Sequence, residues 1–338
     1  MITRATSTEH PRTLSIGGAT YDLFVRTGKD VLREDRGRKI LELPLGNKVR
    51  VQQVIETCGG GAANTSVGLA RLGCSAHFCG ILGSDQWGER QLENFQKEHV
   101  DASATTIVEG ETSSFSIILS AGSGERVILY DPGTNAHLHD ANFDRQSAAN
   151  MDWIYLNHLH EQSCVIEDDI AAILEQNANV GLTWNPGGAQ LKAGMKDAML
   201  QRLLGQTDLL VFNKEETLLF TGETSVEAAM TVLLNAGIRI VCVCDGKNGA
   251  TASDGKHTWH CPVAETPVID TTGAGDAFGT GATWALLHGV DLPEMLRAGT
   301  ISAASVLGTI GAQAGLLTDT QMRQQLKEIR LEVTEIPS

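Results

Sequence analysis

The sequence lacks the features that mark several large classes of protein. Lysine and arginine total 26 against 41 aspartate and glutamate residues, for a formal net charge of -15. That deficit of cations argues against nucleic acid and anionic membranes as partners. None of the seven cysteines falls into CxxC spacing, so neither a zinc site nor a disulfide framework is indicated. No apolar run reaches membrane-spanning length, and we find no internal repeat, low-complexity tract or domain linker.

The remaining composition is that of an ordinary globular protein. The length of 338 residues suffices for a large core. The first twelve residues are polar and lack an apolar signal segment. We therefore expect a disordered tail over residues 1–12, a single α/β domain over 13–338, and a cytoplasmic protein whose cysteines stay reduced.

Two kinds of strand pattern alternate with turns and helices. Beyond residue 132, short apolar runs alternate with amphipathic helix patterns, which is typical of βαβ units and a parallel sheet. Earlier, polar and apolar residues alternate in 48–56, 112–120 and 125–130, as in a sheet with one face in water. The last two runs flank the turn AGSG and predict a hairpin. We expect these strands, from about 23–57 and 105–130, to form a small accessory sheet.

The most informative stretch is DTTGAGDAFGTG at 270–281, which reads as a strand end, a glycine turn and a helix start. Gly273, Ala274 and Gly275 leave backbone N–H groups free to converge on an anion at the positive end of the helix. Asp276 follows in the first turn. A carboxylate beside an anion cradle suits phosphoryl transfer to a hydroxyl, with the carboxylate taking the proton. The alternative is a glycine-rich cap with an ordinary first-turn Asp.

Further polar groups follow predicted strands or glycine turns. Asp22 lies just past the first strand, and Asn64 follows the glycine turn that opens a helix. NKEE, with Asn213 and Glu216, follows the strand DLLVF and could hold Mg²⁺ waters and a phosphate oxygen, or simply cap a helix. CDGKNG at 244–249 is a turn that could line a nucleotide, or a plain surface turn.

Two of these segments resemble the signature motifs of the PfkB, or ribokinase-like, family of carbohydrate and nucleoside kinases. They are GGGAANTSVGLARLG at 59–73 and DTTGAGDAFGTG at 270–281. The resemblance runs from Thr13 to about Thr318. It implies a doubly wound, mostly parallel sheet flanked by helices, with a small β-sheet lid over the substrate, and a reaction that uses ATP and Mg²⁺.

The resemblance also implies roles for individual residues. Asp276 would be the base, and the anion hole would be formed by the amides of Gly273, Ala274, Gly275 and Asp276. The acceptor's hydroxyls would be held by Asp22, Gly59, Gly60 and Asn64. The nucleotide would be bound by Asn213, Glu216, Cys244, Gly246 and Gly249. Glu216 would also bind Mg²⁺ through water. A monovalent cation such as K⁺, used by some members, would lie at Asp270 and Thr272 near the loop 311–315.

The acceptor stays open at this level. Gly61 stands where the ribokinase pattern GGKGAN has lysine, whereas LYDPGTNA at 129–136 is similar to the ribokinase and nucleoside kinase form. We expect a kinase that phosphorylates a sugar or sugar-like alcohol. The alternatives are a nucleoside kinase acting on the ribose 5′-hydroxyl, with Phe24, Phe115 and Trp184 as candidate wall residues, and a non-catalytic sugar- or nucleotide-binding regulator.

Two further expectations concern cofactor and assembly. GGATYD at 17–22 lacks the three-glycine fingerprint of dinucleotide-binding folds, which argues against an NAD-dependent dehydrogenase. The segment between Asp22 and Gly59 is longer than in the small members of this family. A larger lid could cover the substrate more fully or pair two subunits into a homodimer through exposed strand edges.

Overall fold

A computed structural model describes residues 9–28, 31–121, 126–140, 143–159 and 164–337. Within them, ten strands form one sheet in the order β16-β15-β14-β13-β12-β11-β10-β1-β6-β7. Pairing is parallel from β7 through β13, and β14, β15 and β16 are antiparallel. The strands are β1 (Arg12–Ile16), β6 (Ser75–Gly83), β7 (Asp101–Val108), β10 (Trp153–Leu156), β11 (Gly181–Trp184), β12 (Leu209–Asn213), β13 (Ile240–Cys244), β14 (Ala250–Ser253), β15 (Thr258–Cys261) and β16 (Thr334–Ile336).

Helices cover both faces of this sheet because its central strands are apolar on both sides. One face packs against α3 (Arg145–Ala149), α4 (Cys164–Gln176), α5 (Gly188–Ala193), α6 (Ala198–Leu204), α7 (Lys214–Thr221) and α8 (Val226–Asn235). The other packs against α1 (Gly61–Arg71), α2 (Gln86–Lys97), α9 (Ala274–Leu287), α10 (Leu292–Leu307) and α11 (Asp319–Glu328). Two short 3₁₀ segments, η2 (Gly133–Asp140) and η3 (Gly246–Asn248), complete the described helices. The predicted doubly wound α/β fold is confirmed.

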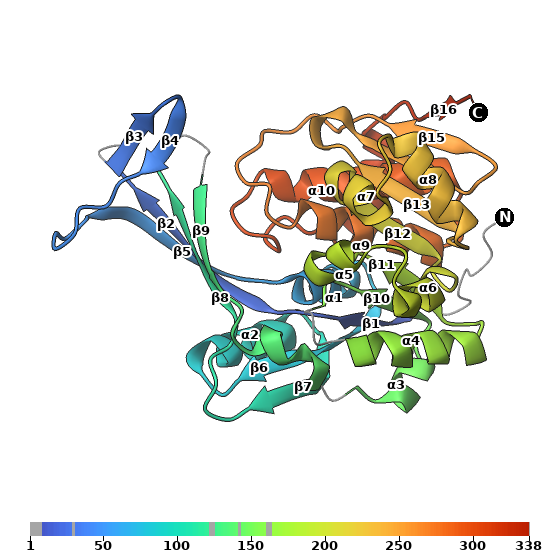
Figure 1. Cartoon of the computed structure of the whole chain (residues 1–338), viewed down its shortest axis with the longest axis horizontal. Helices are drawn as coiled ribbons and strands as arrows, with labels where there is room; N and C mark the ends of the chain where they lie inside the picture. Colours follow the sequence, from blue (N-terminus) through green and yellow to red (C-terminus); the bar gives the residue numbers. More distant parts are fainter. Residues whose placement is uncertain (1–8, 29–30, 122–125, 141–142, 160–163, 338) are drawn as a thin grey trace.

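A second sheet projects from this body and is called the lid below (Figure 1). Its order is β5-β2-β8-β9, with bounds β2 (Thr20–Thr27), β5 (Val51–Gly59), β8 (Phe115–Ser120) and β9 (Arg126–Asp131). A two-stranded hairpin, β3 (Leu32–Asp35) with β4 (Arg38–Leu41), extends it. The predicted β8–β9 hairpin is confirmed by antiparallel pairing. Residues 122–124 of its AGSG turn lie outside the described residues.

The structure differs from the predicted boundaries in two places. β7, which was expected to contribute to the lid from about residue 105, pairs in parallel with β6 at the edge of the main sheet. An edge strand is half exposed, so its alternation looks like that of a lid strand. The tail is also shorter than residues 1–12, because Pro11 is buried and β1 begins at Arg12. Residues 1–8 lie outside the described part of the chain.

No helix among the described residues has the length and apolar character needed to cross a bilayer.

Candidate active site

The glycine turn and helix start predicted at 270–281 are present as the N-terminus of α9. Gly273 caps the helix in the left-handed region, with φ of 77°. A side chain there would also collide with Ala312, so the position requires glycine. Gly275 is exposed, and nothing described lies within 4 Å of where its side chain would be. The Ala274 N–H donates to the Thr271 carbonyl at 3.3 Å, which leaves the amides of Gly275 and Asp276 best placed for an anion.

Asp276 is a carboxylate with few stabilising partners. Its Oδ2 accepts a hydrogen bond from Asn64 Nδ2 at 2.8 Å, which joins the two predicted motifs. Burial raises the pKa of Asp276 to about 6; the Asn64 bond lowers it and the negative charge of Glu216 raises it. Asn64 itself is buried in α1, behind Gly60, whose φ of 94° begins that helix. Asp276 is therefore a carboxylate poised to gain or lose a proton near neutral pH.

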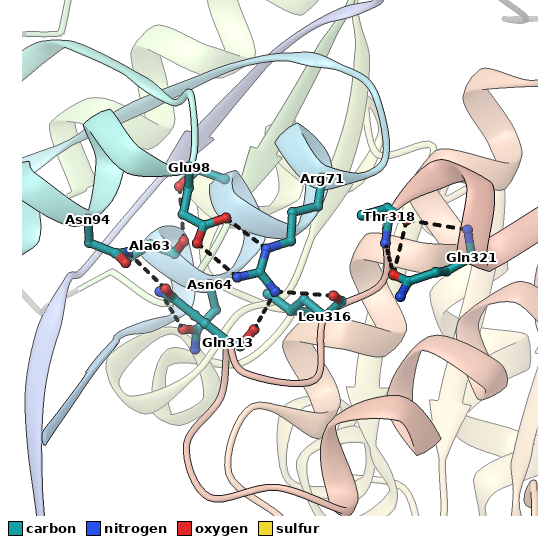
Figure 2. Close-up of polar contacts among 10 residues, drawn as sticks. Ala63, Asn64, Arg71, Asn94, Glu98, Gln313, Leu316, Thr318 and Gln321 are labelled. Atoms are coloured by element: carbon teal, nitrogen blue, oxygen red, sulfur yellow. Dashed lines mark hydrogen bonds and ion pairs between the residues drawn. The ribbon is translucent and has the colours of Figure 1, made fainter. Parts of the chain in front are cut away.

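A chain of amide hydrogen bonds fixes the orientation of Asn64 (Figure 2). Asn64 Oδ1 accepts from Gln313 Nε2 at 3.2 Å, and Gln313 Oε1 accepts from Asn94 Nδ2 at 2.9 Å. Because each amide presents its oxygen to the residue before it, Asn64 is left to present its NH₂ group to Asp276. Sequence reasoning missed Gln313 and Asn94, since the loop 311–315 was considered only for its backbone carbonyls.

Arg71 anchors the loop that carries Gln313. Its guanidinium donates to the backbone carbonyls of Gln313 at 2.7 Å and Leu316 at 3.1 Å. The same group holds Glu98 through two hydrogen bonds of 2.8 and 2.9 Å (Figure 2). Helices α1 and α2 and the loop after α10 are thereby tied together behind Asn64 and Asp276.

The predicted acceptor-binding residues meet at the base of the lid. Asp22 lies on β2 and is 6% exposed. Burial raises its pKa to about 6, while a hydrogen bond with Ser116 lowers the pKa and the charge of Asp270 raises it. Gly59 ends β5 directly beside the Asp22 carboxylate, and Gly60 packs so closely that a Cβ would lie 2.6 Å from Ala19 Cα. The glycines thus let the lid strands and α1 meet at Asp22.

The residues predicted to bind nucleotide lie at the ends of adjacent strands. Asn213 and Cys244 are opposite each other in the β12–β13 register. Asn213 Oδ1 accepts from the Glu216 N–H at 2.8 Å, and Glu216 Oε2 accepts from the Asn213 N–H at 2.9 Å, so the capping alternative is locally present. Burial raises the pKa of Glu216 and raises that of Cys244 to about 12. Gly246 and Gly249 bound the η3 turn that follows.

Asp270, at the other end of the motif, is held by many donors. Its carboxylate accepts from the Thr272 N–H at 3.1 Å, from Thr272 Oγ1 at 2.8 Å and from the Gly311 N–H at 3.2 Å. Arg126 of the lid forms an ion pair with it and also donates to Thr271 Oγ1 at 3.2 Å. Although burial favours the neutral acid, these bonds and the Arg126 charge hold the pKa of Asp270 below its usual value. Arg126 was not predicted from the sequence.

The candidate wall residues are not gathered together. Phe24 lines a cavity under the lid, and Phe115 packs 6.4 Å from Trp87 between ring centroids. Trp184 is fully buried in the main core, with its ring centroid 6.1 Å from that of Phe220, so it is wrong as a ligand wall. Trp184 ends β11, and its side chain packs into the core between the main sheet and the helices on one face. Among the described residues no group of three or more His, Cys, Asp or Glu side chains is arranged to hold a metal by itself.

A helix start with an exposed glycine, a half-buried carboxylate of raised pKa beside it and a lid sheet joined to the same motif through Arg126 form an arrangement that suits group transfer to a hydroxyl. The model of the family described as pfkB family carbohydrate kinase matches residues 32–319. The chain belongs to this family, and it is a phosphotransferase with an alcohol group as acceptor.

Relatives of known sequence cover most of the chain. An uncharacterized sugar kinase from Archaeoglobus fulgidus is 30% identical, covering 74% of this chain and 98% of that protein. A ribokinase from Haemophilus influenzae is 29% identical, over 77% of this chain and 84% of its own. An ATP-dependent ribose-1-phosphate kinase from Halopiger xanaduensis is 27% identical, covering 91% of this chain and 96% of that protein.

Solved structures share the fold. A ribokinase from Arabidopsis thaliana, complexed with ribose and ATP, superposes with a TM-score of 0.76 at 21% identity, covering 94% of this chain and 99% of that one. A nucleoside kinase from Burkholderia thailandensis, in complex with inosine, superposes with a TM-score of 0.75 at 20% identity, covering 94% of this chain and 98% of that one.

Proposed function

We propose that this chain transfers the γ-phosphoryl group of ATP to a hydroxyl of a sugar or sugar-like acceptor, with Asp276 as the base. The observation that carries the proposal is the placement of Asp276 in the first turn of α9, next to the exposed Gly275 amide and hydrogen-bonded to Asn64. Asp22 and Asn64 would hold the acceptor's other hydroxyls. The family match and the ATP-dependent relatives support this assignment.

The reaction requires a base and a place for negative charge. Asn64 engages Oδ2 of Asp276, which leaves Oδ1 for the acceptor hydroxyl. As the oxygen–phosphorus bond forms, the hydroxyl proton passes to Asp276. The amides of Gly275 and Asp276, at the positive end of α9, stabilise the transferred phosphoryl group, while the lid excludes water. Asp276 needs no higher pKa, because the hydroxyl becomes acidic only as that bond forms.

Mg²⁺ fits the second part of the site. The ion commonly keeps several waters and uses one or two carboxylates together with substrate phosphates, so a cluster of three protein ligands is not required. We propose that Glu216, whose half-buried carboxylate lies near enough to Asp276 to influence its pKa, holds the ion through water, with Asn213 beside it. When bound, Mg²⁺ would neutralise charge on the phosphates. Cys244, Gly246 and Gly249 would line the nucleotide.

A monovalent cation is proposed at Asp270 and Thr272. The Asp270 carboxylate already accepts an ion pair from Arg126 in this structure. K⁺ would therefore share the Asp270 carboxylate with Arg126 or compete with Arg126 for it, and Arg126 can neutralise that carboxylate without K⁺. This makes K⁺ an accessory cofactor in the proposal, with ATP and Mg²⁺ as the essential pair.

The test is ADP release from ATP and Mg²⁺ with a panel of acceptors: ribose, fructose, ketodeoxygluconate, their phosphates where these exist, and ribonucleosides. Asp276→Asn serves as the blank, and each acceptor is assayed with and without K⁺. An acceptor that raises the rate above this blank supports the kinase assignment. If ATP binds but no acceptor raises ADP release, the regulator alternative is favoured.

A nucleoside kinase is the second candidate for the same site. Phe24, which lines the cavity under the lid, could stack on a base. The panel separates the two, since a nucleoside kinase would phosphorylate ribonucleosides in preference to free sugars.

We also propose a cytoplasmic location and a homodimer formed through the lid. β5 and β9 are the edge strands of the lid and carry exposed apolar residues such as Val54 and Leu129. Sedimentation of the intact chain and of a Val54→Lys, Leu129→Lys variant tests the dimer, because charges on the edges should leave a monomer.

A further inference from the structure

The inner face of the lid is divided into rows by the strand register. Alternate residues of a strand share a face, so neighbours across β5, β2 and β8 form rows at right angles to the strands. The row nearest the catalytic helix is polar and consists of Thr57, Asp22 and Ser116. The next row is apolar and consists of Ile55, Phe24 and Ile118. The outer row consists of Gln53, Arg26 and Ser120.

A cavity of about 210 Å³ lies between this face and the body of the molecule. It is lined on the lid side by the apolar and outer rows, and on the body side by Ile269, Asp270 and Ile310. This volume is several times the roughly 30 Å³ that one water occupies in the liquid, so it has room for a substituent larger than a hydroxyl. The cavity is therefore a second compartment beyond the polar row that contains Asp22.

The outer end of this compartment is rich in hydrogen-bond donors. Arg26 is exposed, and its side chain makes no hydrogen bond or ion pair with another described residue. Gln53 and Ser120 flank it in register and add an amide and a hydroxyl. Arg126 lies beside Ser120 on β9 and neutralises Asp270, the cavity's single described carboxylate. The two guanidinium groups and one carboxylate leave a positive charge in a chain whose net charge is -15.

We propose that the acceptor carries an anionic group, a phosphate or a carboxylate, that binds Arg26, Gln53 and Ser120 at the outer end of the lid cavity. The inference rests on the proposed kinase function. Four residues of extended strand separate Asp22 from Arg26, about 13 Å between Cα atoms, and the long arginine side chain shortens that span. The acceptor's hydroxyls contact the polar row, its carbon skeleton packs on Phe24 and Ile55, and its anion meets Arg26.

The nucleotide is a poorer occupant for this end of the cavity. Its γ-phosphate must lie at the N-terminus of α9, and its other parts would extend toward Asn213 and Gly246. These residues follow β12 and β13 in the body of the molecule, away from the lid (Figure 1). A phosphate of ATP at Arg26 would have to lie beyond the acceptor rather than behind the transferred group.

The experiment compares matched acceptors in three proteins: the wild type, Arg26→Gln and Arg33→Gln. Ribose is paired with ribose 1-phosphate and ribose 5-phosphate, fructose with fructose 6-phosphate, and ketodeoxygluconate represents carboxylates. The anionic member of a pair should have a kcat/KM at least tenfold above its neutral partner. Arg26→Gln should lower that value by about tenfold through KM, as expected for a charged hydrogen bond in a partly exposed site. Arg33, exposed on β3 and outside the cavity lining, is the charge-matched control and should change nothing.

The outcomes separate the inference from the function on which it rests. Preference for a phosphate or for the carboxylate supports the anionic subsite and names its ligand. Two results overturn the subsite while leaving the kinase intact: anionic acceptors used no better than neutral ones and equally well by wild type and Arg26→Gln, or an Arg26→Gln effect confined to the KM for ATP. If no sugar is phosphorylated, the kinase proposal fails. Calorimetric binding of the anionic sugars then decides the subsite: loss of binding in Arg26→Gln alone supports it, and unchanged or absent binding overturns it.

Discussion

Asp270 and Asp276 stand at the two ends of one glycine motif, yet their surroundings push their carboxyl groups in opposite directions. Asp270 accepts hydrogen bonds from Thr272 and Gly311 and an ion pair from Arg126, and its pKa is lowered. Asp276 is half-buried and accepts a hydrogen bond from Asn64, and desolvation raises its pKa to about 6. Both are acids near a helix start; desolvation outweighs the Asn64 hydrogen bond at Asp276, whereas several donors outweigh desolvation at Asp270.

This contrast assigns different work to the two residues. A carboxylate saturated with donors holds a fixed charge, which suits it to tying the lid to the body through Arg126. A half-buried carboxylate with one described amide donor and a raised pKa can accept a proton at little cost, which suits catalysis. The sequence motif contains both acids without distinguishing them.

The largest expected effect is on turnover when each acid loses its charge. Asp276→Asn should lower kcat by about 10²- to 10⁴-fold, because a general base contributes a factor of that order. ATP binding, measured by calorimetry, should stay nearly unchanged. The fold-decrease in kcat for Asp270→Asn should be less than a tenth of that for Asp276→Asn. Its main effect should be a lower melting temperature, because Arg126 loses its partner. Equal losses of turnover in the two variants would contradict the distinction.

The next effect concerns the amide chain behind Asp276. Gln313→Leu removes the group that orients Asn64, so kcat should fall about tenfold, within the range for loss of a neutral hydrogen bond at a buried site. The weaker Asn64 bond should also raise the Asp276 pKa and move the acid limb of the kcat profile to higher pH.

Gln321→Leu is the matched control for that variant. Gln321 lies in the same region but caps α11 through Thr318 and has no described contact with Asn64 (Figure 2). It should cost some stability and leave the acid limb in place. A shift of that limb in Gln321→Leu, or none in Gln313→Leu, would show that the amide chain does not tune the base.

Stability should respond to pH in a direction set by the raised acids. The pKa of Asp276 is about 6 in the folded chain against 3.8 for an ordinary aspartate, and Asp22 is shifted to the same value. Between these pH values the folded state binds more protons than the unfolded state. These two groups therefore make the protein more stable as pH falls from about 6 toward 4. Urea unfolding at several pH values should show a smaller slope of stability against pH in Asp276→Asn. Asp270 contributes to stability with the opposite sign, because its pKa is lowered in the folded chain.

The smallest effect concerns K⁺. Because Arg126 already pairs with Asp270, K⁺ should change wild-type activity by no more than about twofold to threefold. Arg126→Gln leaves the carboxylate without its guanidinium, so stimulation by K⁺ should increase in that variant. Rates in K⁺ and in tetramethylammonium at equal ionic strength measure this. Strong K⁺ dependence of the wild type together with none in Arg126→Gln would contradict the proposal that Arg126 and K⁺ compete for Asp270.

The parts of the fold that local patterns determine could be predicted from the sequence. The β–α alternation, the helix start at Asp276 and the β8–β9 hairpin follow from periodicity and turn chemistry within short segments. The assignment of β7 to the lid was wrong because an edge strand and a lid strand alternate alike. The three-residue β16 leaves almost no pattern to recognise.

The missed site residues are those that the tertiary structure brings in from a distance. Gln313 lies 249 residues from Asn64, and Arg126 lies 144 residues from Asp270. Neither stands in a motif whose local chemistry demands it. The burial that raises the Asp276 pKa is likewise a property of the packed helices rather than of DTTGAGD. Sequence reasoning expected different roles for the two acids, and the structure adds the surroundings that move their pKa values in opposite directions.

The central claim is that Asp276 is the proton acceptor, and the single-turnover rate of phosphoryl transfer as a function of pH tests it most directly. With saturating ATP, Mg²⁺ and the best acceptor, the account predicts a rate that rises with pH through an apparent pKa near 6. The limb should persist in Asp22→Asn and disappear in Asp276→Asn. A rate that is flat between pH 5 and 8, or an Asp276→Asn variant with the wild-type limb, would contradict the account.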